Sequence, residues 1–289
     1  MSIDPEYADY CSKENCTNLL TSKTEAKHGF CDPCYMDTEE LVGRDIVVWF
    51  SCGAASAVAA KKTIEIYGMY NRIRIVNNPV INEHPDNQRF LKDVEKWLGH
   101  PIEFAVNPKY PSTDCNDVWN DRRFMSGIGG APCTQELKKR ARQHWEDKNH
   151  HDYMVLGFTK DEEKRHAQFV RNERPNLLPV LINEGITKQD CFDLIIKNKI
   201  DLPEIYKLGF PNANCIGCVK ATSPTYWNLV REKFPDIFKE RADMALKYGA
   251  KLVRVNKVRI QLHDLDPNAK GRSLKNYRID CGIFCEEEW

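Results

Sequence analysis

The chain has 289 residues, of which 42% are apolar and 29% charged, enough for one large domain with a small appendage or for two modest domains. Lysine and arginine together number 42, as do aspartate and glutamate, so no net charge draws the whole molecule toward nucleic acid or an anionic membrane. Any contact with nucleic acid must therefore be local.

Neither the apolar runs nor the opening residues predict membrane insertion or secretion. The longest apolar runs, such as residues 46–50, are far shorter than the roughly 20 residues of a membrane-spanning helix. The opening sequence MSIDPEYADY is acidic and lacks the apolar core of a secretory signal. We therefore expect a cytoplasmic globular protein without membrane contact, whose twelve cysteines serve as metal ligands or catalytic thiols.

Residues 1–40 are predicted to form a separate module, because they are polar and hold few periodic apolar residues. Two close cysteine pairs, with C-x4-C and C-x2-C spacing, are separated by fourteen residues in this segment. Such a layout suits a structural zinc ion with four thiolate ligands and no open position. Four unrelated buried cysteines are the weaker interpretation, since this segment has little core of its own. The predicted zinc ligands are Cys11, Cys16, Cys31 and Cys34.

Residues 41–289 are predicted to form an α/β nucleotide-binding domain. Strands are expected at 46–50, 73–76, 102–106 and 153–156, and helices at 54–67, 86–98 and 136–147. Alternating units of this kind predict a parallel sheet covered by helices on both faces, with ligands beyond the carboxyl ends of the strands. Residues 107–132 are expected to form a loop. From residue 187 the chain is expected to be mainly helical, with an irregular, basic and cysteine-bearing tail.

The loop 51–56, with sequence SCGAAS, follows the first predicted strand and opens the first predicted helix. Small residues there let backbone amides approach a phosphate or sulfate, and the helix amino terminus favours negative charge. Many strand-to-helix turns use small residues only for tight packing, so this loop alone indicates a nucleotide site weakly.

Later segments strengthen that indication. The segment 157–162 is similar to a G-I-R-x-x-E-S element, and 178–218 to P-I-x-x-W...L-Y-x-x-G-F...C-x-G-C. Cys133 with Lys138 is similar to C-C-x-x-x-K, and residues 280–284 to a terminal E-C-G-L-H. With the first loop, which is similar to S-G-G-x-D-S, these segments resemble the phosphoadenylyl-sulfate (PAPS) reductase family. That family belongs to the adenine nucleotide α-hydrolase-like (PP-loop) superfamily.

The resemblance implies an adenylyl-sulfate type of nucleotide held over the sheet, with its sulfonate presented to Cys281 as the nucleophile. The residues implied to bind the nucleotide are Ser51, Gly53, Ser56, Lys138, Gly157 and Arg165. Some positions depart from the family pattern. Ala55 replaces the loop aspartate that helps hold magnesium in ATP-cleaving relatives, Thr134 replaces the second cysteine of the C-C pair, and Asp280 and Phe284 replace the terminal glutamate and histidine.

Cys215 and Cys218 have the C-x2-C spacing of two neighbouring metal ligands, and we call this pair the clip. A metal centre there needs further ligands from elsewhere in the chain. The resemblance implies a four-iron four-sulfur cluster, with the ligand set Cys133, Cys215, Cys218 and Cys285. The rival is a zinc ion with the ligand set Cys215, Cys218, Cys281 and Cys285. The remaining cysteines, Cys52, Cys115 and Cys191, are expected to be core or surface residues.

Three functions follow from these patterns. The first is thiol-dependent reduction of adenylyl sulfate or phosphoadenylyl sulfate to sulfite, with a thiol reductant protein as partner. The second is ATP-dependent transfer of sulfur to a nucleic acid, and the third is non-catalytic nucleotide binding by an adaptor. Residues 251–278 hold eight basic side chains against two acidic ones, a segment that suits an anionic substrate, a nucleic-acid backbone or a solvated surface.

Overall fold

The computed structural model describes residues 41–127, 130–172 and 174–274. The predicted four-cysteine zinc module at 1–40, as well as Cys281 and Cys285, lies outside these residues. Among the residues that are described, no helix combines the length and the apolar character needed to cross a membrane.

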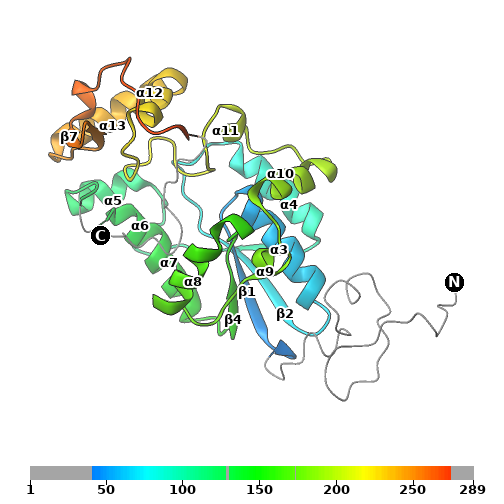
Figure 1. The fold of residues 1–289 in the computed structure, drawn as a ribbon. Coiled ribbons are helices and arrows are strands. Elements are labelled where there is room, and N and C mark those ends of the chain that lie inside the picture. Colours follow the sequence, from blue (N-terminus) through cyan, green and yellow to red (C-terminus); the bar gives the residue numbers. More distant parts are fainter. Residues whose placement is uncertain (1–40, 128–129, 173, 275–289) are drawn as a thin grey trace, which may run out of the picture.

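A five-stranded parallel sheet forms the centre of the fold (Figure 1). Its strands are β1 (Asp45–Phe50), β2 (Arg72–Asn77), β3 (Ile102–Phe104), β4 (Tyr153–Val155) and β5 (Leu177–Leu178), in the order β3-β2-β1-β4-β5. The chain runs outward from β1 to β3 and then returns to place β4 on the other side of β1. The topological switch point, where open α/β sheets bind ligands, therefore lies between β1 and β4.

The side chains of β1 alternate between two apolar cores. Ile46, Val48 and Phe50 face one core, whereas Val47 and Trp49 face the other. The first core includes residues of α3 (Ala54–Tyr67), α4 (Asn87–Leu98), α9 (Val180–Asn183) and α10 (Lys188–Lys197). The second includes residues of α7 (Ala141–Glu146) and α8 (Glu163–Asn172). The predicted α/β fold, a parallel sheet with helices on both faces, is thus confirmed.

A third core lies beside the sheet. It is built from short elements that come after β3 and after α10, and in Figure 1 α12, α13 and β7 stand apart from the strands. These elements are α5 (Cys115–Arg122), α6 (Pro132–Thr134), the π-helix η3 (Gln135–Arg140), α11 (Glu204–Lys207), α12 (Pro224–Lys233), α13 (Pro235–Lys247), β6 (Val253–Val255) and β7 (Val258–Ile260). Two 3-10 turns, η4 (Lys160–Glu162) and η5 (Leu262–Asp264), complete the described elements.

Two regions differ from the sequence-based expectation. The segment 107–132 contains helix α5, which begins where the Asp114 side chain accepts a hydrogen bond from the backbone N–H of Asn116. The tail beyond residue 250 contains the antiparallel hairpin β6–β7. Its turn residues Asn256 and Lys257 have φ values of +48° and +67°, as a tight hairpin turn requires, although neither is glycine.

Adjacent residues on α10 test how that helix packs. Ile195 is fully buried in the core that α10 shares with α3, whereas Ile196 is 58% exposed. We expect Ile195→Ala to lower the free energy of unfolding by about 2–5 kcal/mol, because it leaves a cavity. Ile196→Ala is the matched control and should change it by less than about 0.5 kcal/mol. Urea unfolding followed by circular dichroism measures both, and equal effects would contradict this packing.

Candidate functional site

The loop between β1 and α3 is held in shape by its own serines. The Ser56 hydroxyl donates to the Gly53 carbonyl oxygen at 2.9 Å, and it accepts from the backbone N–H of Ser51 at 3.1 Å. The Ser51 hydroxyl lies 3.2 Å from the same Ser56 oxygen. Ser56 is buried and Ser51 is exposed. Ser56 therefore shapes the loop, while Ser51 is the hydroxyl at its surface.

Gly157 brings the end of β4 against the start of α3. A Cβ atom at Gly157 would lie 2.7 Å from the backbone nitrogen of Ser56, a distance that packed atoms do not adopt. A Cβ at Gly53 would lie 3.3 Å from the Tyr206 hydroxyl and 3.8 and 4.0 Å from the hydroxyl oxygens of Ser51 and Ser56, and the Gly53 φ of −101° suits any residue. Thus a protein contact already requires glycine at position 157, whether or not a nucleotide approaches it.

Tyr206 covers the amino terminus of α3. Backbone N–H groups of Ala54 and Ala213 hydrogen bond to its hydroxyl oxygen, and burial raises the pKa of Tyr206 to about 12. The phenol is therefore neutral at physiological pH. One of the orphan donors in the first turn of α3 is satisfied by this neutral group, which adds no negative charge to compete with an anion.

Cys52 lies inside the loop with a left-handed φ of +55°. The Asn77 side chain, at the end of β2, donates to the Phe50 carbonyl oxygen at 2.8 Å and lies 3.5 Å from the Cys52 sulfur. Burial is the main cause that raises the pKa of Cys52 well above its ordinary value, and the charge of Glu83 adds to it. Cys52 is therefore a thiol rather than a thiolate at neutral pH. Asn77 and Glu83 are site residues that the sequence motifs do not reveal.

The two predicted nucleotide-binding cations each have an acidic partner. Lys138 Nζ lies 3.7 Å from a carboxylate oxygen of Glu83, and both side chains are nearly buried. Arg165 donates to Glu162 at 2.8 Å and stacks 5.1 Å from the ring centre of Phe158. Lys138 lies near the loop, since its charge acts on the Cys52 thiol. Arg165 lies beside the segment that follows Gly157.

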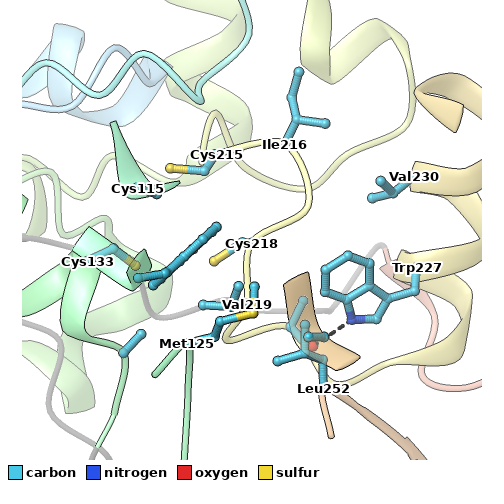
Figure 2. Packing of buried hydrophobic residues seen from close by; sticks show 14 of the residues in the cluster. Cys115, Met125, Cys133, Cys215, Ile216, Cys218, Val219, Trp227, Val230 and Leu252 are labelled. Atoms are coloured by element: carbon cyan, nitrogen blue, oxygen red, sulfur yellow. Dashed lines mark hydrogen bonds between the residues drawn. The ribbon is translucent and has the colours of Figure 1, made fainter. Parts of the chain in front are cut away.

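Four cysteines from three segments meet in the third core (Figure 2). They are Cys115 at the start of α5, Cys133 in α6, and Cys215 and Cys218 in the loop before α12. All four are at least nine-tenths buried. Figure 2 shows the Cys218 sulfur pointing toward Cys133 and the Cys215 sulfur toward Cys115.

Cys115 is the centre of this group. Its thiol hydrogen bonds to those of Cys133 and Cys215, and these contacts, followed by burial, raise the pKa of Cys115 well above its ordinary value. From the sequence alone Cys115 is expected to be a core or surface residue, because α5 is hidden in a segment expected to be a loop. The structure brings Cys133, Cys215 and Cys218 together as predicted, but the fourth cysteine that it places with them is Cys115. The predicted ligand Cys285 lies outside the described residues.

Asn82 joins the nucleotide loop to the cysteines. Its side-chain oxygen accepts from the backbone N–H of Cys115 at 2.7 Å, and its carbonyl oxygen accepts from the N–H of Ile216 at 2.9 Å. The next residue, Glu83, pairs with Lys138 near Cys52. The segment after β2 therefore contacts both sites.

Tyr226 and Gly217 fix the loop that holds Cys215 and Cys218. The backbone N–H of Cys218 donates to the Tyr226 hydroxyl oxygen at 2.9 Å, and this hydroxyl donates to the Cys215 carbonyl at 3.4 Å. Gly217 has a φ of +65°, and a Cβ there would lie 3.1 Å from Cγ of Arg241. The loop thus has a conformation that glycine alone adopts easily.

The cysteines interact as thiols in this structure. None of those in the described segments forms a disulfide, and no three His, Cys, Asp or Glu side chains there are arranged so that they could hold a metal ion without moving. Four soft sulfur donors within a buried core nevertheless have the chemistry that zinc and iron–sulfur clusters require. Cys191 lies in the first core against α3, as expected of a core residue.

The sequence matches no protein-family model and no curated protein. Among solved structures the chain is similar to the U34-tRNA thiolase NcsA from Methanococcus maripaludis with its [4Fe-4S] cluster, over 96% of this chain and 99% of that one. The TM-score is 0.43 and the sequence identity is 11%. No residue role follows from a likeness at this level. The PAPS reductase resemblance drawn from the motifs remains a prediction.

Gly157, after β4, and Gly53, in the loop before α3, provide a matched test. We expect Gly157→Ala to destabilise the fold by about 1–3 kcal/mol, because the end of β4 must move away from α3. The same shift should weaken ATP binding measured by calorimetry. Gly53→Ala, with an ordinary φ and a softer contact, should destabilise the fold much less. If the two variants are equally stable, the close contact between β4 and α3 is not a constraint on the fold.

Proposed function

We propose that the chain is an adenine-nucleotide-dependent enzyme of sulfur chemistry, and that it transfers sulfur to a nucleic acid at the expense of ATP. The observation that carries the proposal is the link through residues 82–83. It puts a loop suited to nucleotide phosphate and a group of four buried cysteines in contact with one segment. An enzyme that activates an acceptor and then delivers sulfur needs both functions close together.

The nucleotide would bind at the switch point between β1 and β4. There the amino terminus of α3 offers backbone N–H groups and a favourable dipole to a phosphate. Ser51 and the backbone at Gly53 are the loop groups placed to contact it. Lys138 would help to neutralise the phosphates, and Glu83 holds its ammonium group in place.

The cysteine group would hold the metal centre. Cys133, Cys215 and Cys218 are the predicted ligands that the structure brings together, and their surroundings are apolar. A four-iron four-sulfur cluster at this position would supply electron transfer.

A basic hairpin favours a nucleic acid as the acceptor. Arg254 and Arg259 are directly opposite each other in the β6–β7 register, and like charges in that position destabilise a hairpin. An anion lying across both would remove the repulsion. The other basic residues of this segment that the structure describes are also exposed; they are Lys251, Lys257, Lys270 and Arg272. Phosphates along a nucleic-acid backbone match this arrangement.

Reduction of adenylyl sulfate is the second candidate. Ala55 stands in the loop where ATP-cleaving relatives of the resembled superfamily have an aspartate, which weakens the support for magnesium. In this version Cys281 attacks sulfur, the nucleotide leaves as a phosphate, and a thiol reductant protein regenerates the enzyme. The basic residues of segment 251–278 would then bind the nucleotide instead of a nucleic acid.

Three substrates separate the candidates. Full-length protein purified without oxygen is incubated with ATP plus RNA and sulfide, with adenylyl sulfate, or with phosphoadenylyl sulfate plus a dithiol. Release of pyrophosphate with sulfur incorporated into the RNA supports the proposal. Release of sulfite from either sulfated nucleotide supports the reductase instead. Nucleotide binding without any turnover contradicts both and supports an adaptor.

The hairpin gives a second test. We expect Arg254→Gln combined with Arg259→Gln to weaken RNA binding severalfold, and to reduce the slope of log affinity against log salt by about 2, because each arginine would neutralise one phosphate. The matched control is Lys92→Gln with Lys96→Gln, which removes the same charge from exposed positions on α4. Fluorescence anisotropy over a salt series measures both. Equal effects in the two double variants would mean that net charge, and not the hairpin, drives binding.

A further inference from the structure

The geometry points to Cys115 as the fourth ligand of a closed four-thiolate metal centre, together with Cys133, Cys215 and Cys218. This goes beyond the proposed function, which requires a metal centre but does not depend on which residue completes it. It also replaces Cys285, which the sequence alone favoured for that position.

The hydrogen bonds between the thiols are the first observation that supports Cys115 as a ligand. Cys115 hydrogen bonds to Cys133 on one side and to Cys215 on the other. It therefore lies between the ligand that the family resemblance implies and the pair that the C-x2-C spacing indicates. Cys218 shares a tight loop with Cys215, held by the Tyr226 hydroxyl. The four sulfurs therefore belong to one buried group (Figure 2). A metal would replace the S–H contacts with metal–thiolate bonds and release the thiol protons.

The backbone around Cys115 is built to place it. Thr113, two residues earlier, has a φ of +56°, which is a strained conformation for a β-branched residue. Its carbonyl accepts from the N–H of Ile81 at 3.2 Å, and Asn82 accepts from the N–H of Cys115 at 2.7 Å. Asn82 also holds Ile216, between the two cysteines of the clip. Asn82 thus positions Cys115 against the clip. The strained backbone of Thr113 persists only because the surrounding contacts enforce it.

A buried cation balances the charge that such a centre would carry. Arg241 is 2% exposed and contacts the clip at Gly217 through its aliphatic stem. One guanidinium nitrogen, Nη1, donates to Asn116 at 3.0 Å and to Glu240 at 2.8 Å. Its Nε, also buried, has no hydrogen-bond partner among the residues that the structure describes. Four thiolates outweigh the charge of a zinc ion or an oxidised four-iron cluster, so the buried charge of Arg241, which packs against the clip by its stem and is shared with Glu240, would offset part of the excess.

Thiols this close together can also form a disulfide, and this is the alternative to test. A disulfide between Cys115 and either neighbour would pair two sulfurs and exclude them from a metal. The buried charge of Arg241 favours the anionic centre, because a disulfide is neutral and needs no cation.

The assignment has a chemical consequence. Four cysteine ligands leave no open position on a zinc ion, or on any iron of a four-iron cluster. The centre would then transfer electrons or hold the third core together, and it would not bind the sulfur that is transferred. That sulfur would have to come from free sulfide, which displaces AMP from the adenylated acceptor without any change of oxidation state.

Metal analysis of three single variants tests the inference. Full-length wild type, Cys115→Ser, Cys285→Ser and Cys191→Ser are purified anaerobically, and iron, acid-labile sulfide, zinc and the visible spectrum are measured. We expect about four irons and four sulfides per wild-type chain. Cys115→Ser should lose at least half of this metal, while Cys285→Ser and the buried-cysteine control Cys191→Ser should keep it. Full metal in Cys115→Ser, loss in Cys285→Ser, or a disulfide at Cys115 in anaerobic wild type would overturn the assignment.

Two further readouts separate ligation from folding and from the proposed function. Chelated, metal-free wild type and Cys115→Ser should have the same thermal midpoint, and only wild type should regain metal when iron and sulfide are returned. A lower midpoint for the metal-free variant would mean that Cys115 acts through packing, which overturns the ligand role. Zinc in place of iron, lost again in Cys115→Ser, keeps the four-thiolate centre but removes the cluster from the proposed function. ATP affinity of the same variants reports the nucleotide site independently.

Discussion

The hydrogen bonds of Asn82 connect the parallel sheet to the third core. Through the Cys115 N–H and the Ile216 N–H, a segment leaving the sheet is tied to α5 and to the loop before α12. These two segments are separated by about a hundred residues of chain that build β4, β5 and much of both sheet cores. Together with the hydrogen bonds from Ile81 to Thr113 and from Lys188 to Pro211, this connection positions the third core against the carboxyl ends of the strands.

The sheet could be predicted because its strands carry the pattern that burial on both faces demands. Ile46 to Phe50 is continuously apolar, and each residue enters one of two cores. Strand β5 was missed because two residues do not make a pattern. Helix α5 was missed for a different reason. Its buried residues Cys115, Val118 and Trp119 have helical spacing, but Pro, Asn and Gly around them outweigh eight residues of signal.

The site was predictable in its residue types and less so in their roles. Gly157 and Ser56 do lie together, yet each is explained by the protein's own packing. Cys115 shows the limit most clearly. Nothing in its local sequence sets it apart from Cys191, and only folding brings it between Cys133 and Cys215. Spacing identifies ligands that are neighbours in the chain, whereas a partner supplied from elsewhere depends on tertiary structure.

The π-helical stretch η3 determines where the charges beside the site point. Glu136 and Lys138 are both buried, although they are only two residues apart. Glu136 pairs with Arg122 and Arg140 and accepts from Asn107, while Lys138 reaches Glu83. A π-helix has i→i+5 hydrogen bonds and therefore a wider turn than an α-helix, so it gives these neighbours directions that an α-helix would not. Because the wider turn accommodates one extra residue, deleting one residue from this stretch would turn Lys138 away from Glu83 and leave every remaining side chain unchanged.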